Sequence, residues 1–306
     1  MSRKKGKVFG VVGTITHDFI TFSSGRSFSG LGGILYQAAA LCGLGKEAHL
    51  FSNLGEELLP MVKKVTSKWP GCKTRGLCVV PGPGNRVHLR YPARGERAEV
   101  LESCVPALNP GPLIKRAFQF DFLIAVINSG RDFTFQDWRK IVSAVQAPIW
   151  LDVHSLPLAF VLKRLRSYRP LTRWRDWVEG IAYLQANEKE VASMLGDPSV
   201  LPSLSRIKHF GQEALELGLK AVFVTLGRRG VLVMAPGVYR ILKPPAVLGI
   251  VDTTGCGDVF CAAAAARLAA GADPVKAALS GIRFASPAAG VAGVEETYML
   301  VRSSQL

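Results

Sequence analysis

The chain of 306 residues lacks several features that would each point to a particular class of protein. No apolar run approaches the roughly 18 residues that a membrane-spanning helix needs, and the start, Met1 to Lys7, has no secretory apolar core. The six cysteines contain no CxxC pair, and several lie in apolar segments where cysteine behaves as a small hydrophobic residue. We therefore expect a soluble protein of the reducing cytoplasm, neither exported nor bound to a membrane.

Acidic residues are scarce relative to basic ones, with 23 Asp and Glu against 38 Lys and Arg and a formal net charge of +15. Such an excess raises the question of a nucleic-acid partner. However, the chain contains no recognisable nucleic-acid-binding module, and a solvated basic surface accounts for the charge more simply. We do not expect a nucleic-acid partner on this basis. The densest basic cluster consists of Lys163, Arg164, Arg166, Arg169, Arg173 and Arg175.

Apolar runs typical of strands alternate with helical patterns along most of the chain, and 48% hydrophobic residues suffice to bury a large core. This alternation predicts an α/β fold with a central, mostly parallel sheet and helices on both faces. We expect helices over residues 31–44, 136–145, 185–195 and 203–217. We expect strands at Val8 to Val12, Ala48 to Ser52, Phe122 to Ile127, Ile149 to Val153, Ile181 to Leu184, Ala221 to Thr225 and Val231 to Met234.

Two regions, residues 14–29 and 77–101, interrupt this alternation with strand-like pieces separated by turn residues. They resemble antiparallel hairpins. A small sheet formed by them would cover the ends of the parallel strands, where ligands of open α/β folds bind. The alternative is that the same pieces only extend the edge of the main sheet.

The most specific motif is Asp252-Thr253-Thr254-Gly255-Cys256-Gly257-Asp258, which follows an apolar run ending at Val251 and opens an alanine-rich helix. Small residues at Gly255, Cys256 and Gly257 allow backbone N–H groups to converge at the positive end of the helix. Asp258 beside this anion hole is placed to accept a proton from an attacking hydroxyl. Asp and Gly are also common at helix starts for structural reasons alone. Together the residues indicate phosphoryl transfer.

This motif and its flanks resemble the C-terminal signature of the ribokinase-like carbohydrate kinases, the PfkB family. Gly30-Leu31-Gly32-Gly33 before a small-residue helix resembles the family's N-terminal signature. The motifs follow the family's order along essentially the whole chain. The resemblance implies a single ribokinase-like domain over residues 1–306, with a β lid formed by approximately residues 14–30 and 77–103.

On the substrate side, the resemblance implies that Asp18 accepts hydrogen bonds from acceptor hydroxyls and that Gly32 and Gly33 line the acceptor. Family members usually carry Asn where this chain has Gln37, so we expect Gln37 to contact the substrate with a longer side chain. The strand end Asp152-Val153-His154 departs from the family's Asp-x-Asn-x-Arg pattern. The missing Arg favours an unphosphorylated acceptor.

On the nucleotide side, Asn187 and Glu190 form a capping-box pattern that needs no ligand, although the resemblance places them beside hydrated Mg²⁺, with Glu190 acting through water. The family's nucleotide loop corresponds to Thr225, Gly227, Arg228 and Gly230. Family members often need K⁺, which implies ligands near Asp252 and in residues 285–290.

These patterns favour an ATP-dependent kinase that phosphorylates a hydroxyl of a sugar or a sugar-containing compound such as a nucleoside. A catalytically silent ribokinase-like protein, using its basic surface to bind nucleic acid, is the alternative. A dinucleotide-dependent oxidoreductase is set aside, because the glycine spacing after the first strand is missing. The sequence leaves open the identity of the acceptor and whether the lids of two copies pair in a homodimer.

Overall fold

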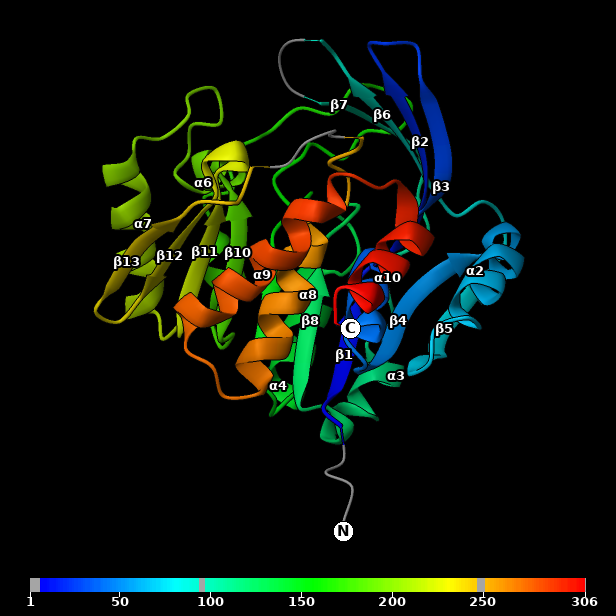
Figure 1. Ribbon diagram of the computed structural model, residues 1–306, viewed down its shortest axis with the longest axis horizontal. Helices are drawn as coiled ribbons and strands as arrows, with labels where there is room; N and C mark the ends of the chain where they lie inside the picture. Colours follow the sequence, from blue (N-terminus) through cyan, green and yellow to red (C-terminus); the bar gives the residue numbers. More distant parts are fainter. Residues whose placement is uncertain (1–5, 94–96, 247–250, 306) are drawn as a thin grey trace.

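A computed structural model describes residues 6–93, 97–246 and 251–305 of the chain. Within them, a nine-stranded sheet of order β13-β12-β11-β10-β9-β8-β1-β4-β5 forms the centre (Figure 1). Neighbours from β11 to β5 run parallel, whereas β12 and β13 are antiparallel. The strands are β1 Val8–Val12, β4 Glu47–Gly55, β5 Cys72–Val80, β8 Phe122–Val126, β9 Ile149–Asp152, β10 Tyr183–Asn187, β11 Ala221–Thr225, β12 Val231–Ala235 and β13 Val238–Leu242.

Helices cover both faces of this sheet, as predicted, and each face has its own apolar core. Residues of α1, α2, α8, α9 and α10 contribute to one core, and residues of α3 to α7 contribute to the other. No helix of the described residues is long and apolar enough to cross a membrane. The helices are α1 Leu35–Gly43, α2 Leu59–Thr66, α3 Gly111–Ile114, α4 Phe135–Ala144, α5 Trp174–Val178, α6 Glu188–Met194, α7 Leu204–Glu216, α8 Cys256–Ala269, α9 Pro274–Ala288 and α10 Gly293–Ser303.

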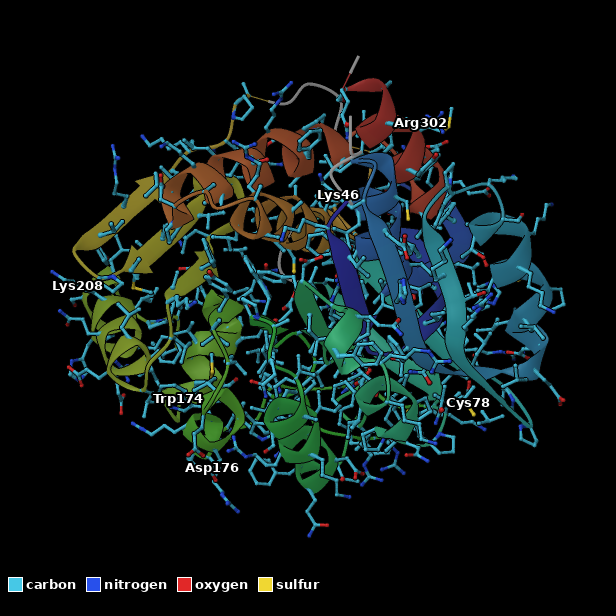
Figure 2. The ribbon with its side chains drawn as sticks, turned by 90° about the horizontal axis from the view of Figure 1, so that it is seen from below. Lys46, Cys78, Trp174, Asp176, Lys208 and Arg302 are labelled. Atoms are coloured by element: carbon cyan, nitrogen blue, oxygen red, sulfur yellow. The ribbon has the colours of Figure 1, made fainter. Side chains whose placement is uncertain are left out.

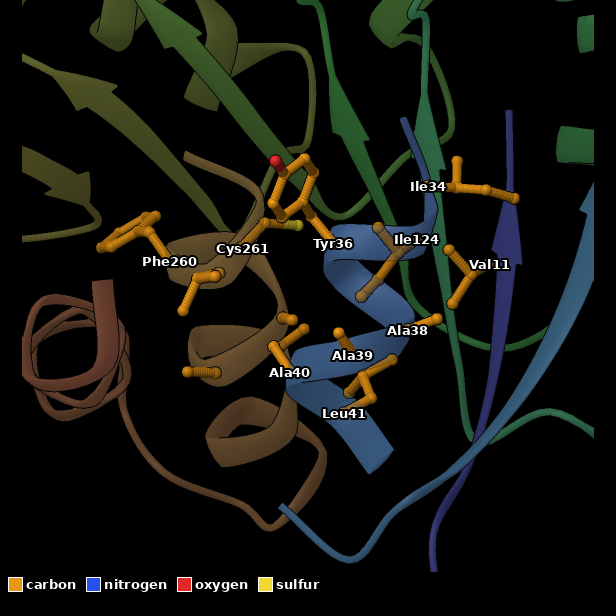
Figure 3. Packing of buried hydrophobic residues seen from close by; sticks show 14 of the residues in the cluster. Val11, Ile34, Tyr36, Ala38, Ala39, Ala40, Leu41, Ile124, Phe260 and Cys261 are labelled. Atoms are coloured by element: carbon orange, nitrogen blue, oxygen red, sulfur yellow. The ribbon is translucent and has the colours of Figure 1, made fainter. Parts of the chain in front are cut away.

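Helix α8 is enclosed by its neighbours, and its composition explains how. Ala262, Ala263, Ala264 and Ala265 are fully buried, so α8 presents small side chains on every side. Figure 3 shows Ala39 and Ala40 of α1 lying toward this helix. Because alanine also has the highest helix propensity, the segment forms a helix that packs tightly against both α1 and α9.

A second, four-stranded sheet of order β3-β2-β6-β7 stands apart from the main sheet (Figure 1). It begins directly after β1, at the carboxyl end of that strand. The outer pairs, β2 with β3 and β6 with β7, are antiparallel hairpins, whereas β2 and β6 are parallel. Its strands are β2 Ile15–Phe22, β3 Ser27–Gly33, β6 Asn85–Tyr91 and β7 Ala98–Ser103.

Three predicted boundaries were wrong, each because pairing between distant segments overrides the local pattern. Leu31 to Gly33 end β3 by pairing with β2, so the predicted helix over 31–44 begins at Leu35. Leu77 to Val80 belong to β5 at the edge of the main sheet, where Figure 2 labels Cys78. Gln185 to Asn187 end β10, so the following helix begins at Glu188.

The chain between β9 and α5 ties the small sheet to the rest of the protein. The backbone N–H groups of Lys163 and Arg166 donate to the carbonyl oxygens of Leu101 and Glu99 on β7, at 2.8 and 3.0 Å. The Arg166 side chain is fully buried and donates to Glu99 Oε1 at 2.7 Å. It also donates, at 2.8 Å, to the carbonyl oxygen of Ser129, a residue shortly after β8. A buried ion pair therefore fastens β7 to the main sheet.

We expect Arg166→Met to lower the free energy of unfolding by about 3–5 kcal/mol, because it leaves the buried Glu99 carboxylate with only the more distant, partly exposed Arg97 as a partner. The double variant Arg166→Met with Glu99→Leu removes both charges and is expected to recover most of that loss. Urea unfolding of the four proteins of this cycle measures the effect. A single variant as stable as the wild type would contradict the assignment.

Candidate active site

The N-terminus of α8 has the geometry of an anion-binding turn. Gly255 caps the helix with a left-handed backbone (φ 81°), and a Cβ there would lie 2.3 Å from the Tyr36 ring. The Cys256 amide donates to the Thr253 carbonyl oxygen at 3.3 Å. Within the described part of the chain, the Gly255 and Gly257 amides have no acceptor. Two of the three predicted donors are therefore free, whereas the Cys256 amide is engaged in the turn. The apolar run before the motif falls mainly on residues 247–250, outside the described residues.

Asp258 lies in the first turn of α8 and is buried. Burial raises the pKa of its carboxyl to about 7, although a hydrogen bond from Gln37 and the charge of Arg97 act in the opposite direction. Gln37 Nε2 of α1 donates to Asp258 Oδ1. The Gln37 side chain is itself fully buried, and its Oε1 has no partner among the described residues. Gln37 thus contacts the carboxylate of Asp258 directly.

Asp18 of β2 lies beside the glycines of β3. A Cβ on Gly32 would lie 2.0 Å from Asp18 Oδ2, so only glycine leaves room for this carboxylate. Gly33, two residues before α1, follows in the same strand. Burial raises the pKa of Asp18 to about 7, and Asp252 contributes in the same direction. The structure therefore brings Asp18, Gly32 and Gly33 together at the end of β3 that leads into α1.

Asn187 and Glu190 form the predicted capping box at the start of α6. Asn187 Oδ1 accepts from the Glu190 N–H at 2.9 Å, and Glu190 Oε2 accepts from the Asn187 N–H at 2.7 Å. Glu190 Oε1 accepts from Asn187 Nδ2 at 2.6 Å, so both carboxylate oxygens are occupied. Burial raises the pKa of Glu190 to about 8.

The predicted nucleotide loop connects β11 to β12 at the same edge of the sheet. Asn187 pairs with Thr225 in the β10–β11 ladder, which places the capping box beside this loop. Gly227 and Gly230 frame a short 3₁₀ helix, Gly227–Arg229. Arg229 is paired with Glu188, whereas Arg228 is exposed and has no ion-pair partner in the described segments.

Asp252 is the residue predicted near a monovalent cation. Its Oδ1 accepts from the Thr254 N–H at 2.8 Å, and its buried Oδ2 has no hydrogen-bond partner among the described residues. The Ala289 carbonyl oxygen accepts from the N–H groups of Val251 and Asp252, at 2.8 and 3.2 Å, so the ends of the two predicted segments lie side by side. Most of residues 285–290 is helical, because α9 runs to Ala288. No group of three His, Cys, Asp or Glu side chains suited to a metal ion occurs in the described segments.

Gln185 is a site residue that the sequence analysis missed. Its Nε2 donates to Asp152 Oδ2 at 2.9 Å and to the Gly257 carbonyl oxygen at 3.1 Å, which links the ends of β9 and β10 to the first turn of α8. The sequence could have indicated Gln185 as a site residue, because it lies two residues before Asn187 and so on the same face of the strand. His154, in the departure that follows Asp152, is partly buried, and desolvation lowers its pKa to about 4. His154 is thus neutral at pH 7.

Part of the chain is similar in sequence to known carbohydrate kinases. The family model for pfkB family carbohydrate kinase matches residues 159–298. A Bacillus subtilis ribokinase is 36% identical over 138 residues, 45% of this chain and 41% of that protein. An Arabidopsis thaliana ribokinase is 32% identical over 119 residues, 38% of this chain and 29% of that protein. The matched segments thus span less than half the length of these curated relatives.

Similarity of structure extends over the whole chain. The structure of Arabidopsis ribokinase complexed with ribose and ATP superposes with a TM-score of 0.74 at 18% identity, covering 98% of both chains. Cryptococcus neoformans ribokinase in complex with ADP gives 0.77 at 18% identity, covering 99% and 100%. Residues 159–298 of the chain thus match the PfkB family, and the whole chain has a ribokinase-like fold. Its sheet order and small second sheet are those of a ribokinase-like fold.

A further group that the sequence analysis missed connects the small sheet of this ribokinase-like protein to the α8 turn. The Tyr91 hydroxyl at the end of β6 lies 2.7 Å from Thr254 Oγ1. Arg97, just before β7, forms an ion pair with Glu99, and the β6–β7 ladder places it beside Tyr91. In the sequence, the alternation of side chains along the strands was the only indication of Tyr91 and Arg97, and it does not identify their partners.

We expect Gly255→Ala to lower the free energy of unfolding by at least about 1–3 kcal/mol, because Ala is strained at this φ and its Cβ meets Tyr36. Gly257→Ala is the matched control, since its Cβ would make only an ordinary 3.5 Å contact with Gln185 Nε2. Urea unfolding of both variants tests the geometry. Equal stabilities of the two variants would show that the turn differs from the one described.

Proposed function

We propose that the chain is an ATP-dependent kinase that transfers a phosphoryl group to a hydroxyl of a sugar or a sugar-containing small molecule. The observation that carries the proposal is the buried Asp258 carboxyl, with a pKa of about 7, beside free amides at the N-terminus of α8. A general base is most effective when its pKa is near the working pH. The family match and the relative solved with ribose and ATP add support for a sugar acceptor.

In this mechanism Asp258 accepts the proton of the acceptor hydroxyl as that oxygen attacks phosphorus. The Gly255 and Gly257 amides, with the positive end of α8, stabilise the charge that develops on the transferred group. The Cys256 amide joins them if it leaves the Thr253 carbonyl oxygen. ATP would supply the phosphoryl group, and Mg²⁺ would neutralise part of its charge.

Acceptor and nucleotide take opposite sides of Asp258 in this proposal. Asp18 accepts hydrogen bonds from acceptor hydroxyls beside Gly32 and Gly33, and the free Oε1 of Gln37 accepts a further one. The nucleotide phosphates lie along Thr225, Gly227, Arg228 and Gly230, the loop next to Asn187. The small sheet acts as a lid that excludes water from the reacting groups.

Two carboxylates of the site, Glu190 and Asp252, are the proposed ligands of the metal ions. Glu190 has both oxygens bound to Asn187, so it would reach Mg²⁺ through water, which suits an ion that keeps several of its waters. The buried, unpartnered Asp252 Oδ2 is a suitable ligand for K⁺. A structure of Escherichia coli phosphofructokinase-2 in complex with potassium has the same fold.

The alternative of a silent nucleic-acid-binding protein is not favoured. Three arginines of the basic cluster have acidic partners, Arg166 with Glu99, Arg173 with Asp176 and Arg175 with Glu213. A basic surface engaged in this way offers fewer charges to a polyanion.

We expect Asp258→Asn to lower turnover by about 10²- to 10⁴-fold, the usual contribution of a general base, while ATP still binds. An ADP-release assay across a panel of sugars and nucleosides first identifies an acceptor for the wild type. The variant is then assayed with that acceptor, and calorimetry measures its affinity for ATP. Turnover near that of the wild type would refute the role of Asp258.

We expect kcat/KM to rise with pH and to level off above about pH 7, because Asp258 must be unprotonated to accept a proton and its pKa is about 7. Asp18 titrates in the same range, so the profile is also recorded for Asp18→Asn. Glu190 has a pKa of about 8, so a rising limb near pH 7 that survives in both Asp18→Asn and Glu190→Gln belongs to Asp258. A profile that is flat from pH 5 to 8 would contradict the environment described for Asp258.

A further inference from the structure

Arg97 belongs to the face of the small sheet that is turned toward the protein interior. Side chains alternate between the two faces of a strand, so Arg97 shares a face with Glu99 and Leu101. Glu99 and Leu101 are both buried. On the neighbouring strand β6, Leu89 is buried on the inner face, whereas Arg90 is exposed on the outer face.

Glu99 is shared between two arginines, and the sharing leaves a positive charge. Arg166 Nη1 lies 2.7 Å from Glu99 Oε1, whereas Arg97 Nη2 lies 3.3 Å from Glu99 Oε2. The Arg166 side chain is fully buried and held by two further carbonyl oxygens. One carboxylate neutralises one guanidinium, so the pair of arginines carries a net charge of +1. That charge is available at Arg97, whose side chain is 34% exposed.

Arg97 lies close to the α8 turn. Arg90 pairs with Ala98 in the β6–β7 ladder, which places Arg97 beside Tyr91, and the Tyr91 hydroxyl lies 2.7 Å from Thr254 Oγ1, one residue before Gly255. Its charge also acts on carboxyls from three sides of the site, since it opposes the burial that raises the pKa of Asp18, Asp258 and Glu190. Arg97 is thus close to the acceptor side, the base and the nucleotide side together.

We propose that Arg97 is a catalytic residue that donates hydrogen bonds from the lid to the phosphoryl group during its transfer. This inference rests on the proposed kinase activity. As the acceptor oxygen forms its bond to the γ-phosphorus, the bond from that phosphorus to the β–γ bridging oxygen breaks and ADP leaves. The hydroxyl proton passes to Asp258. Arg97 keeps its own protons and stabilises charge on the equatorial oxygens, as guanidinium groups do in other phosphoryl transfers.

Glu99 and Arg166 act as positioning residues in this proposal. Glu99 holds the guanidinium group of Arg97 in one orientation. Arg166 in turn binds Glu99 and the Ser129 carbonyl oxygen, which fixes Glu99 to the segment after β8. These contacts hold the charge of Arg97 in place over the site, so the donor is pre-organised before the substrates bind.

Three variants test the role of Arg97, with the acceptor identified for the wild type. We expect Arg97→Met to lower kcat by about 10²- to 10³-fold, the usual cost of removing one donor to the transition state. KM for ATP and for the acceptor is expected to change by no more than a few fold. Arg97→Lys keeps the positive charge but loses the paired N–H donors of the guanidinium group. Its kcat is expected to lie between those of the wild type and Arg97→Met. Arg90→Met is the matched control on the outer face and is expected to behave as the wild type.

Two further measurements separate catalysis from folding. Thermal unfolding shows whether each variant is folded, and added guanidinium ion is expected to restore part of the kcat of Arg97→Gly. An unchanged kcat in Arg97→Met, or a loss confined to the KM of the acceptor, would overturn the inference. A wild type that phosphorylates no acceptor would instead refute the proposed function, so the two failures are distinguishable.

Discussion

The burial of several carboxyl groups in one place is the constraint on which the rest of this structure depends. Asp18, Asp152, Glu190 and Asp258 are buried, and burial is the largest cause of the raised pKa of each. Leaving such groups out of water is costly unless they are neutral, hydrogen-bonded or paired. The fold offsets this cost through Gln37, Gln185 and Asn187, each of which donates to one of the carboxylates. The clustering of these carboxyls is therefore maintained at the expense of stability.

Much of the architecture could be predicted from local sequence. The apolar runs of β1 and β11 gave their bounds, because strands buried on both faces must be almost wholly apolar. Asp258 and the capping box of Asn187 and Glu190 were also evident, since helix starts have strong local signatures. What remained hidden depends on segments far apart in the chain. Glu99 and Arg166 are 67 residues apart, and no local pattern pairs them.

Gln37 illustrates how a single departure from the family pattern changes a site. The longer Gln37 side chain donates a hydrogen bond to Asp258, where it opposes the effect of burial on the pKa of that carboxyl. In the proposed mechanism this bond also fixes which oxygen of Asp258 is free to accept a proton. The unpartnered Oε1 of Gln37 then adds an acceptor on the substrate side. In the proposed mechanism Gln37 thus acts on both the base and the acceptor, whereas the sequence indicated only the second.

The small sheet is attached to the remainder of the protein in two distinct ways, and the difference matters for its motion. The buried Arg166 side chain binds both Glu99 on β7 and the Ser129 carbonyl oxygen after β8. Breaking the Arg166–Glu99 ion pair would leave an unpaired charge in the protein interior. Tyr91 and Thr254 make one hydrogen bond between partly buried hydroxyls, which exchanges readily with water. The β6 side therefore separates from the α8 turn at lower cost than β7 separates from the segment after β8. In the proposed mechanism, opening for substrate entry would occur at Tyr91, with Arg166 as the fixed end, and it would withdraw the β6 contact without loss of the fold.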